Sequence, residues 1–124
     1  MAQGTPFQDR SILIVDDEAL IRFDLIDHFE AAGYTVFEAE NADQAIAVLE
    51  RHKSIRVVLT DVQMPGSMDG VRLAHYIRDR YPPTVLIVTS GALRLSGDDL
   101  PDQSVFISKP FNPYRILSML DQML

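Results

Sequence analysis

Near its N-terminus the chain reads Ile12-Leu13-Ile14-Val15-Asp16-Asp17, four consecutive apolar residues followed at once by two carboxylates. An unbroken apolar run of this length is typical of a strand that helices cover on both faces, because a strand with one wet face alternates apolar and polar residues. In a parallel α/β sheet, ligands bind where the strands end. The stretch therefore predicts a central parallel strand with an acidic site at its carboxyl end.

Four further apolar runs follow at intervals that leave room for one helix each. They are Val36-Phe37, Val57-Val58-Leu59, Val85-Leu86-Ile87-Val88 and Val105-Phe106-Ile107. The segments between them place apolar residues at helical spacing, so the chain predicts five βα units. The predicted helix faces are Ile21, Leu25, Phe29 and Ala32, then Ala42, Ala45, Ile46 and Leu49, then Ala74, Ile77 and Tyr81.

Helix boundaries are marked by residues that start or stop helices. Gly33 is placed to end the first helix, Asn41 to cap the second, and Pro82-Pro83 to end the third. Pro113 favours the first turn of a last helix that runs to Leu124. The connection between Gly91 and Gln103 holds Gly97, Asp98, Asp99 and Pro101, so we expect only a short or irregular fourth helix there.

Composition restricts the class of protein. With 124 residues, 47% hydrophobic, the chain has about the length of one domain, and its net charge of −7 with scattered basic residues disfavours nucleic acid as a partner. There is no cysteine, which excludes disulfides and thiolate chemistry. No apolar run is long enough for a membrane span or a signal peptide, so we expect a cytoplasmic protein that does not contact the membrane.

Polar residues follow several of the apolar runs directly. The runs end in Asp16-Asp17-Glu18, Thr60-Asp61, Thr89-Ser90 and Ser108-Lys109-Pro110. Carboxylates from neighbouring strands would repel each other unless a cation lies between them, and Mg²⁺ prefers such oxygen ligands. An aspartate, a bound Mg²⁺, a lysine and a threonine hydroxyl are the parts required to move a phosphoryl group onto a carboxylate. The sequence therefore predicts acyl-phosphate chemistry at this edge.

This ordered set, Asp16-Asp17, Asp61, Thr89 and Lys109-Pro110, resembles the receiver domain of two-component response regulators, the CheY-like superfamily. The resemblance covers residues 11–124 and leaves residues 1–10 as an N-terminal extension. It implies a flavodoxin-like (βα)5 fold, a doubly wound parallel sheet in three layers with strand order 2-1-3-4-5.

The resemblance also implies a role for each matching residue. Asp61 would be the phosphoacceptor, and Asp17 and Asp61 would bind Mg²⁺ (or Mn²⁺) directly, with Asp16 close by and the Gln63 carbonyl completing the ligands. Lys109 would pair with the phosphoryl group. Thr89 would hydrogen-bond it and Phe106 would rotate inward, the two acting as the switch. Pro110 would follow a cis peptide bond.

The chain departs from the usual receiver pattern in several places. The loop Met64-Pro65-Gly66-Ser67-Met68-Asp69-Gly70 is one residue longer than the usual Met-Pro-Gly-Met-Asp-Gly. Gln63 and Gly91 occupy the positions that line the route of the hydrolytic water, Ser90 follows Thr89, and Phe106 replaces a frequent tyrosine.

Two features have a simpler structural interpretation. The acidic triplet Asp16-Asp17-Glu18 is also what a helix N-terminus favours, but capping requires neither Asp61 nor Lys109. The last helix carries more apolar residues than docking on a sheet needs, among them Tyr114, Leu117 and Met123. The simpler interpretation of this helix is a wide core-facing surface with a frayed terminus. We favour the other interpretation, a surface for a downstream protein or a homodimer on the fourth helix, the fifth strand and the last helix.

The expected function is a phosphorylatable switch in a two-component phosphorelay, with a histidine kinase or a histidine phosphotransfer protein as donor. It would be a stand-alone signalling module and not an enzyme, catalysing only its own phosphoryl transfer and dephosphorylation. One alternative is a degenerate receiver that binds partners without phosphorylation. Less favoured alternatives are a Mg²⁺-dependent aspartyl-phosphate phosphohydrolase, which would carry a second aspartate where this chain has Gln63, and a flavin carrier, whose phosphate the acidic first loop would repel.

Overall fold

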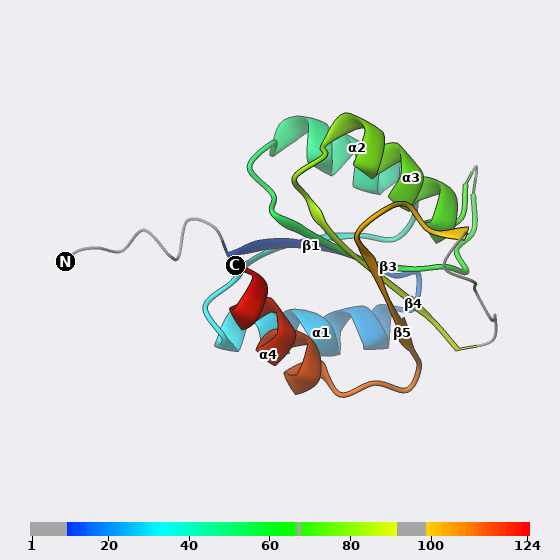
Figure 1. Ribbon diagram of the computed structural model, residues 1–124. Helices are drawn as coiled ribbons and strands as arrows, with labels where there is room; N and C mark the ends of the chain where they lie inside the picture. The colour runs from blue at the N-terminus through cyan, green and yellow to red at the C-terminus, as the bar shows by residue number, and fades with distance from the viewer. Residues whose placement is uncertain (1–9, 67, 92–98) are drawn as a thin grey trace.

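The computed structural model describes residues 10–66, 68–91 and 99–124 and places a parallel five-stranded sheet at the centre of the molecule (Figure 1). The elements in chain order are β1 (Ser11–Val15), α1 (Ala19–Ala31), β2 (Thr35–Ala39), α2 (Ala42–Arg51), β3 (Val57–Asp61), α3 (Gly70–Arg80), β4 (Val85–Ser90), β5 (Ser104–Ser108) and α4 (Pro113–Met123). The strand order is β2-β1-β3-β4-β5, which confirms the predicted doubly wound topology.

Helices cover both faces of the sheet, as the continuous apolar strands require. Helices α2 and α3 lie on one face, and α1 and α4 lie on the other (Figure 1). Every residue of β1 and β3 is buried. The strands at the two edges, β2 and β5, are only partly covered.

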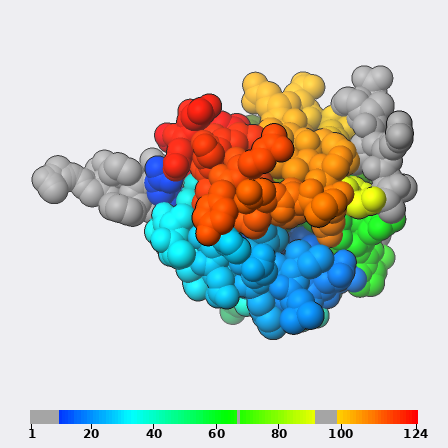
Figure 2. Space-filling view, turned by 90° about the horizontal axis from the view of Figure 1, so that it is seen from below, coloured from blue at the N-terminus to red at the C-terminus, as the bar shows by residue number. Residues whose placement is uncertain are grey.

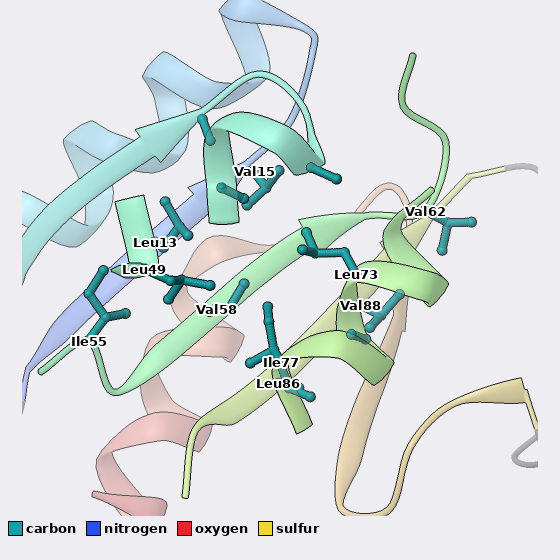
Figure 3. Close-up of a cluster of buried hydrophobic side chains, with 14 residues drawn as sticks. Leu13, Val15, Leu49, Ile55, Val58, Val62, Leu73, Ile77, Leu86 and Val88 are labelled. Carbon is teal, nitrogen blue, oxygen red and sulfur yellow. The ribbon is translucent and has the colours of Figure 1, made fainter. Parts of the chain in front are cut away.

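Two apolar cores fill the space between the layers. In the first, side chains of β1, β3 and β4 such as Val15, Val58 and Val88 pack against Leu73 and Ile77 of α3 (Figure 3). In the second, Ile12 and Ile87 on the opposite face of the sheet belong to one cluster with Phe29 of α1 and Leu120 of α4. Both cores fix where the strands end, and so they position the polar residues that follow.

The helices begin and end close to the residues that were expected to start or stop them. The side chain of Asn41 accepts a hydrogen bond from the Gln44 amide at the start of α2, and Pro113 is the first residue of α4. Helix α1 ends at Ala31, so Ala32, which was expected on its buried face, lies just beyond the helix and is exposed. Gly33 follows with a φ of 93°, a backbone conformation that favours glycine. The short fourth helix expected between Gly91 and Gln103 lies largely outside the described residues, as do the loop position Ser67 and most of the N-terminal extension.

Two further observations concern the surface. Helix α4 buries Ile116 and Leu120 and leaves Tyr114 and Met123 exposed, which confirms the apolar excess expected there. In the parts of the chain that the structure describes, no helix combines the length and the apolar character that a membrane crossing needs.

Candidate functional site

Three residues from three separate segments meet at the carboxyl end of the sheet. Asp16 follows β1, Asp61 ends β3, and Lys109 follows β5. Lys109 Nζ lies 3.5 Å from Asp16 Oδ2 and 3.3 Å from Asp61 Oδ2. Both aspartates are buried, at 3% and 6% exposure. The lysine therefore bridges two carboxylates that are largely shielded from water.

The segment after β1 is held by hydrogen bonds on both sides. The amide of Glu18 donates to Asp16 Oδ1 over 2.9 Å, and Arg22 Nη1 donates to the Asp16 carbonyl over 2.8 Å. Arg22 is buried and also pairs with Glu38 over 2.7 Å. Glu18 is the N-cap residue of α1, but its side chain makes no capping hydrogen bond. The simple capping interpretation of this acidic triplet therefore does not account for its side chains.

The carboxylates that converge are not all the expected ones. Oxygens of Asp16, Glu18 and Asp61 lie within 4.8 Å of one another. Asp17 is exposed and lies outside this group, although it lines a groove of about 470 Å³ together with Gln63. The structure thus adds Glu18 to the acidic cluster and places Asp17 and Gln63 beside it.

The expected switch residues lie on the neighbouring strands. Thr89 of β4 is the register partner of Asp61, and the Val62 amide donates to the Thr89 carbonyl over 2.9 Å. The Lys109 amide donates to the Ser90 carbonyl, also over 2.9 Å. Phe106 on β5 is partly buried against the core beneath β4. The Lys109–Pro110 peptide bond is cis.

Gly70 closes the site from the side of α3. Its amide donates to the Val62 carbonyl over 2.9 Å, and a Cβ added here would lie 2.0 Å from the Asp61 carbonyl oxygen. Any side chain would collide with the backbone of the phosphoacceptor candidate. The start of α3 is therefore packed directly on the end of β3.

Burial and neighbouring charges shift the pKa values of Asp61 and Lys109. Burial raises the pKa of Asp61, and nearby Asp16 adds to the rise, while Lys109 opposes it. Burial alone would lower the pKa of Lys109, but Asp16 and Asp61 outweigh it and raise that pKa. The surroundings therefore favour the charged form of Lys109 and disfavour the ionised form of Asp61 relative to a free carboxyl group.

Comparison with known proteins identifies the family of the chain. The family model described as "Response regulator receiver domain" matches residues 12–121. The chain belongs to the response regulator receiver family.

Several known proteins resemble the chain in sequence or in structure. The chain is 35% identical to the transcriptional regulatory protein ResD of Bacillus subtilis (strain 168), covering 88% of this chain and 45% of ResD. It is also 35% identical to the phosphate regulon transcriptional regulatory protein PhoB of Pseudomonas aeruginosa, covering 93% and 52%. The chain thus spans about half the length of these curated relatives. A CheY-like response regulator receiver domain protein from Methanospirillum hungatei JF-1 superposes with a TM-score of 0.81 at 28% identity, covering 92% of each chain.

Three residues at or beside the site were given no role there by the sequence alone. Glu18 stands two residues after Asp16, and the turn into α1 brings it back to the cluster. Arg22 lies three residues before Leu25 and seven before Phe29, so helical spacing places it on the buried side of α1, but a charged residue is ordinarily exposed. Gly70 belongs to the Asp69-Gly70 pair of the loop, whose glycine signals a close backbone approach.

Replacing Lys109 by methionine should destabilise the receiver at neutral pH by about 2 to 3 kcal/mol, because two buried carboxylates would lose the cation that compensates them. The loss should shrink at acidic pH, where the carboxylates take up protons. In the wild type, folding raises the pKa of Lys109, so its charged form stabilises the folded state. This contribution to stability is complete below pH 10.5, the ordinary pKa of lysine, and is lost as the pH rises through the folded-state pKa. Urea unfolding across this pH range measures both trends.

The control for this substitution is Lys53→Met, which removes the chain's other lysine from an exposed turn. It should change the free energy of unfolding by less than about 0.5 kcal/mol. Equal effects of the two substitutions would show that the contacts of Lys109 with Asp16 and Asp61 contribute nothing to stability.

Proposed function

We propose that this receiver accepts a phosphoryl group on Asp61 from a phosphohistidine donor and transmits that event through a protein-binding surface. The observation that carries the proposal is the convergence of Lys109 Nζ on Asp16 and Asp61 at 3.5 and 3.3 Å at the end of the sheet. A buried carboxylate beside a cation and a second acid is the arrangement that phosphoryl transfer to aspartate needs.

The chemistry follows from the positions of these side chains. An Asp61 carboxylate oxygen attacks the phosphorus, an O–P bond forms, the N–P bond of the phosphohistidine breaks, and the imidazole leaves with the bonding electrons and takes up a proton. Lys109 lies 3.3 Å from Asp61 Oδ2 and would offset the charge of the incoming phosphoryl oxygens. Thr89, the register partner of Asp61, would donate its hydroxyl to the product.

The acidic cluster fits a hard divalent cation. Three carboxylates, those of Asp16, Glu18 and Asp61, offer oxygens within 4.8 Å of one another, and this donor set suits Mg²⁺ or Mn²⁺. We propose Asp17, Asp61 and the Gln63 carbonyl as ligands, with Asp16 close by, and Glu18 as the competing candidate for the place of Asp17. When bound, the ion would supply neutralisation of the carboxylates and of the phosphoryl oxygens.

Mg²⁺ should raise the melting temperature of the wild type and raise it much less in Asp17→Ala, because a ligand that binds only the folded state stabilises it. The stabilisation amounts to about 1.4 kcal/mol when Mg²⁺ is at roughly ten times its dissociation constant. Thermal unfolding with and without Mg²⁺ measures the shift, with Glu18→Gln measured in parallel. A full shift in Asp17→Ala together with a lost shift in Glu18→Gln would assign the position to Glu18 instead.

The surface beside Lys109 supports docking of the donor. Helices α1 and α4 lie side by side on this face (Figure 2), and a groove of about 470 Å³ between them is lined by Leu20, Leu25, Lys109 and Phe111. Leu20, in the lining of this groove, is 84% exposed, and Tyr114 of α4 is 66% exposed elsewhere on the helix. A donor helix that buried these side chains would bring its histidine to the edge where Asp61 lies.

The surface of β5 and α4 supports the output role. Strand β5 is an edge of the sheet, and a hollow of about 830 Å³ lies against it, lined by Phe106, Arg115 and Met119 among others. Phe106 lines this hollow and also packs against the core beneath β4. We propose that a downstream protein, or a second copy of the chain, contacts this face after the ring of Phe106 moves.

The proposal also includes self-catalysed dephosphorylation without turnover of other substrates. Incubation with a chromogenic phosphate ester should release no product, while a phosphoryl group on Asp61 should be lost with time in the isolated chain. Steady release from the ester would instead assign the site to a phosphohydrolase.

A further inference from the structure

A pocket with a cationic lining lies at the end of the sheet where β3 and β4 begin. The connections α2–β3 and α3–β4 run side by side there (Figure 1), and the Val85 amide donates to the Arg56 carbonyl over 2.9 Å. A pocket of about 290 Å³ lies between these connections. Because Arg56 precedes β3 and Asp61 ends it, the pocket lies roughly 16 Å from the phosphoacceptor.

Three cations from two segments line this pocket, two from the α2–β3 connection and one from the end of α3. They are Lys53, Arg56 and Arg80, and no acidic residue is among the lining side chains. Among residues 10–66, 68–91 and 99–124, no carboxylate lies within 4.0 Å of any of these three cations. Such a group is unexpected in a chain of net charge −7 that has only 11 basic residues.

Helix dipoles account for part of this group but not for all of it. Arg80 lies in the last turn of α3, where a cation is favoured, and Lys53 follows the end of α2. Arg56 lies in an extended segment that no helix end explains, and its Nε is buried without a hydrogen-bond partner in the described structure. A buried guanidinium donor without a partner is costly. Because the Nε itself is shielded from solvent, an anion in the pocket would meet the outer nitrogens of the Arg56 guanidinium.

The wall of the pocket is already fixed by another arginine. Arg78 Nη1 donates to the carbonyls of Pro82 and Thr84 over 2.6 and 2.8 Å. The carbonyls that would compete for the pocket cations are therefore satisfied by Arg78, and Pro82 and Pro83 restrict the backbone around them. Arg56 and Arg80 remain to bind a ligand.

We propose that this pocket binds the phosphate group of a small phosphorylated molecule, separately from the phosphoacceptor site. One guanidinium group can bind two phosphate oxygens through parallel N–H donors. Ser54 and Thr84, which carry hydroxyl groups, also line the pocket. The volume is at the lower limit of ligand pockets, which favours a phosphate monoester or diphosphate over a protein segment.

Pyrophosphate titrated into Mg²⁺-free protein in the presence of a chelator tests the proposal, since removal of Mg²⁺ keeps the acidic cluster from retaining the probe. Calorimetry should show one saturable site whose dissociation constant rises at least about tenfold in Arg56→Gln and in Arg80→Gln, the effect of losing one charged hydrogen bond. The control is Arg72→Gln, which removes the same charge from an exposed position of α3 outside the pocket and should bind as the wild type does.

A second readout keeps the test decisive if Arg56→Gln folds poorly. Arg80 is exposed at a helix end, so Arg80→Gln should keep the fold, and circular dichroism checks this. In the wild type, pyrophosphate should shift the amide resonances of Arg56 and Thr84. Lack of saturation, unchanged affinity in both pocket variants, or shifts confined to the vicinity of Lys109 would each overturn the proposal. Because no Mg²⁺ or phosphoryl donor is present, none of these results bears on the function proposed for Asp61.

Discussion

Asp61→Asn is expected to be more stable than the wild type at neutral pH while losing the capacity to accept a phosphoryl group. Burial raises the pKa of Asp61 and Asp16 adds to the rise, so ionised Asp61 costs the folded state free energy. The amide removes that charge, and Lys109 keeps Asp16 as a partner at 3.5 Å. We expect the free energy of unfolding to increase by about 1 kcal/mol, within the usual range of single substitutions.

The direction of the Asp61 pKa shift determines how the stability difference between Asp61→Asn and the wild type depends on pH. A carboxyl group whose folded-state pKa is raised contributes stability below its unfolded value, here 3.8, and loses that contribution as the pH rises through the folded-state pKa. The variant has no such loss, so its advantage should appear above pH 3.8 and then reach a plateau. Urea unfolding at a series of pH values measures the difference, with Asp27→Asn as an exposed control of equal charge change. A variant less stable than the wild type at neutral pH would mean that the pair with Lys109 outweighs the cost of burial.

Gly70→Ala is expected to destabilise the receiver by about 3 kcal/mol or to prevent folding. The added Cβ would lie 2.0 Å from the Asp61 carbonyl oxygen and within 2.9 Å of Val62 Cα, both backbone atoms at the end of a central strand. Strand β3 pairs with β1 and β4 on its two sides and cannot move away without disturbing the sheet. Helix propensity alone predicts the opposite sign, since alanine is favoured over glycine by about 1 kcal/mol in a helix.

Gly91→Ala is the matched control for this substitution. A Cβ at Gly91 would lie 3.5 Å from Lys109 Cβ, an ordinary contact distance, so the free energy of unfolding should change by less than about 0.5 kcal/mol. Denaturant unfolding of both variants measures the contrast. A neutral or stabilising Gly70→Ala would contradict the close packing of α3 on the end of β3.

The sheet and the identity of its polar edge could be predicted because each depends on local patterns. Unbroken apolar runs such as Ile12 to Val15 indicate buried parallel strands, and the residues that follow them must meet at one edge. Lys109 could be placed opposite Asp61 by this reasoning without knowing any distance. The strand order and the role of each residue came from the resemblance, which the family match and the observed topology support.

Other parts of the site depend on tertiary geometry that no local pattern encodes. Whether Asp17 or Glu18 turns toward Asp61 is decided by the turn into α1, where the Glu18 amide binds Asp16 Oδ1. The burial of Arg22 depends on Glu38, which comes from β2 and is sixteen residues distant in the chain. The cationic pocket around Arg56 forms only when two connections meet at the opposite end of the sheet.

The measurement that tests the central claim most directly is the intact mass of the chain after incubation with acetyl phosphate, with and without Mg²⁺, in parallel with Asp61→Asn. We predict a gain of one phosphoryl group in the wild type that requires Mg²⁺ and is absent from the variant. To exclude rapid hydrolysis, the same samples would be tested for binding of beryllofluoride. A wild type that neither gains the phosphoryl group nor binds beryllofluoride, or a variant that is labelled equally, would contradict the assignment of Asp61 as the phosphoacceptor.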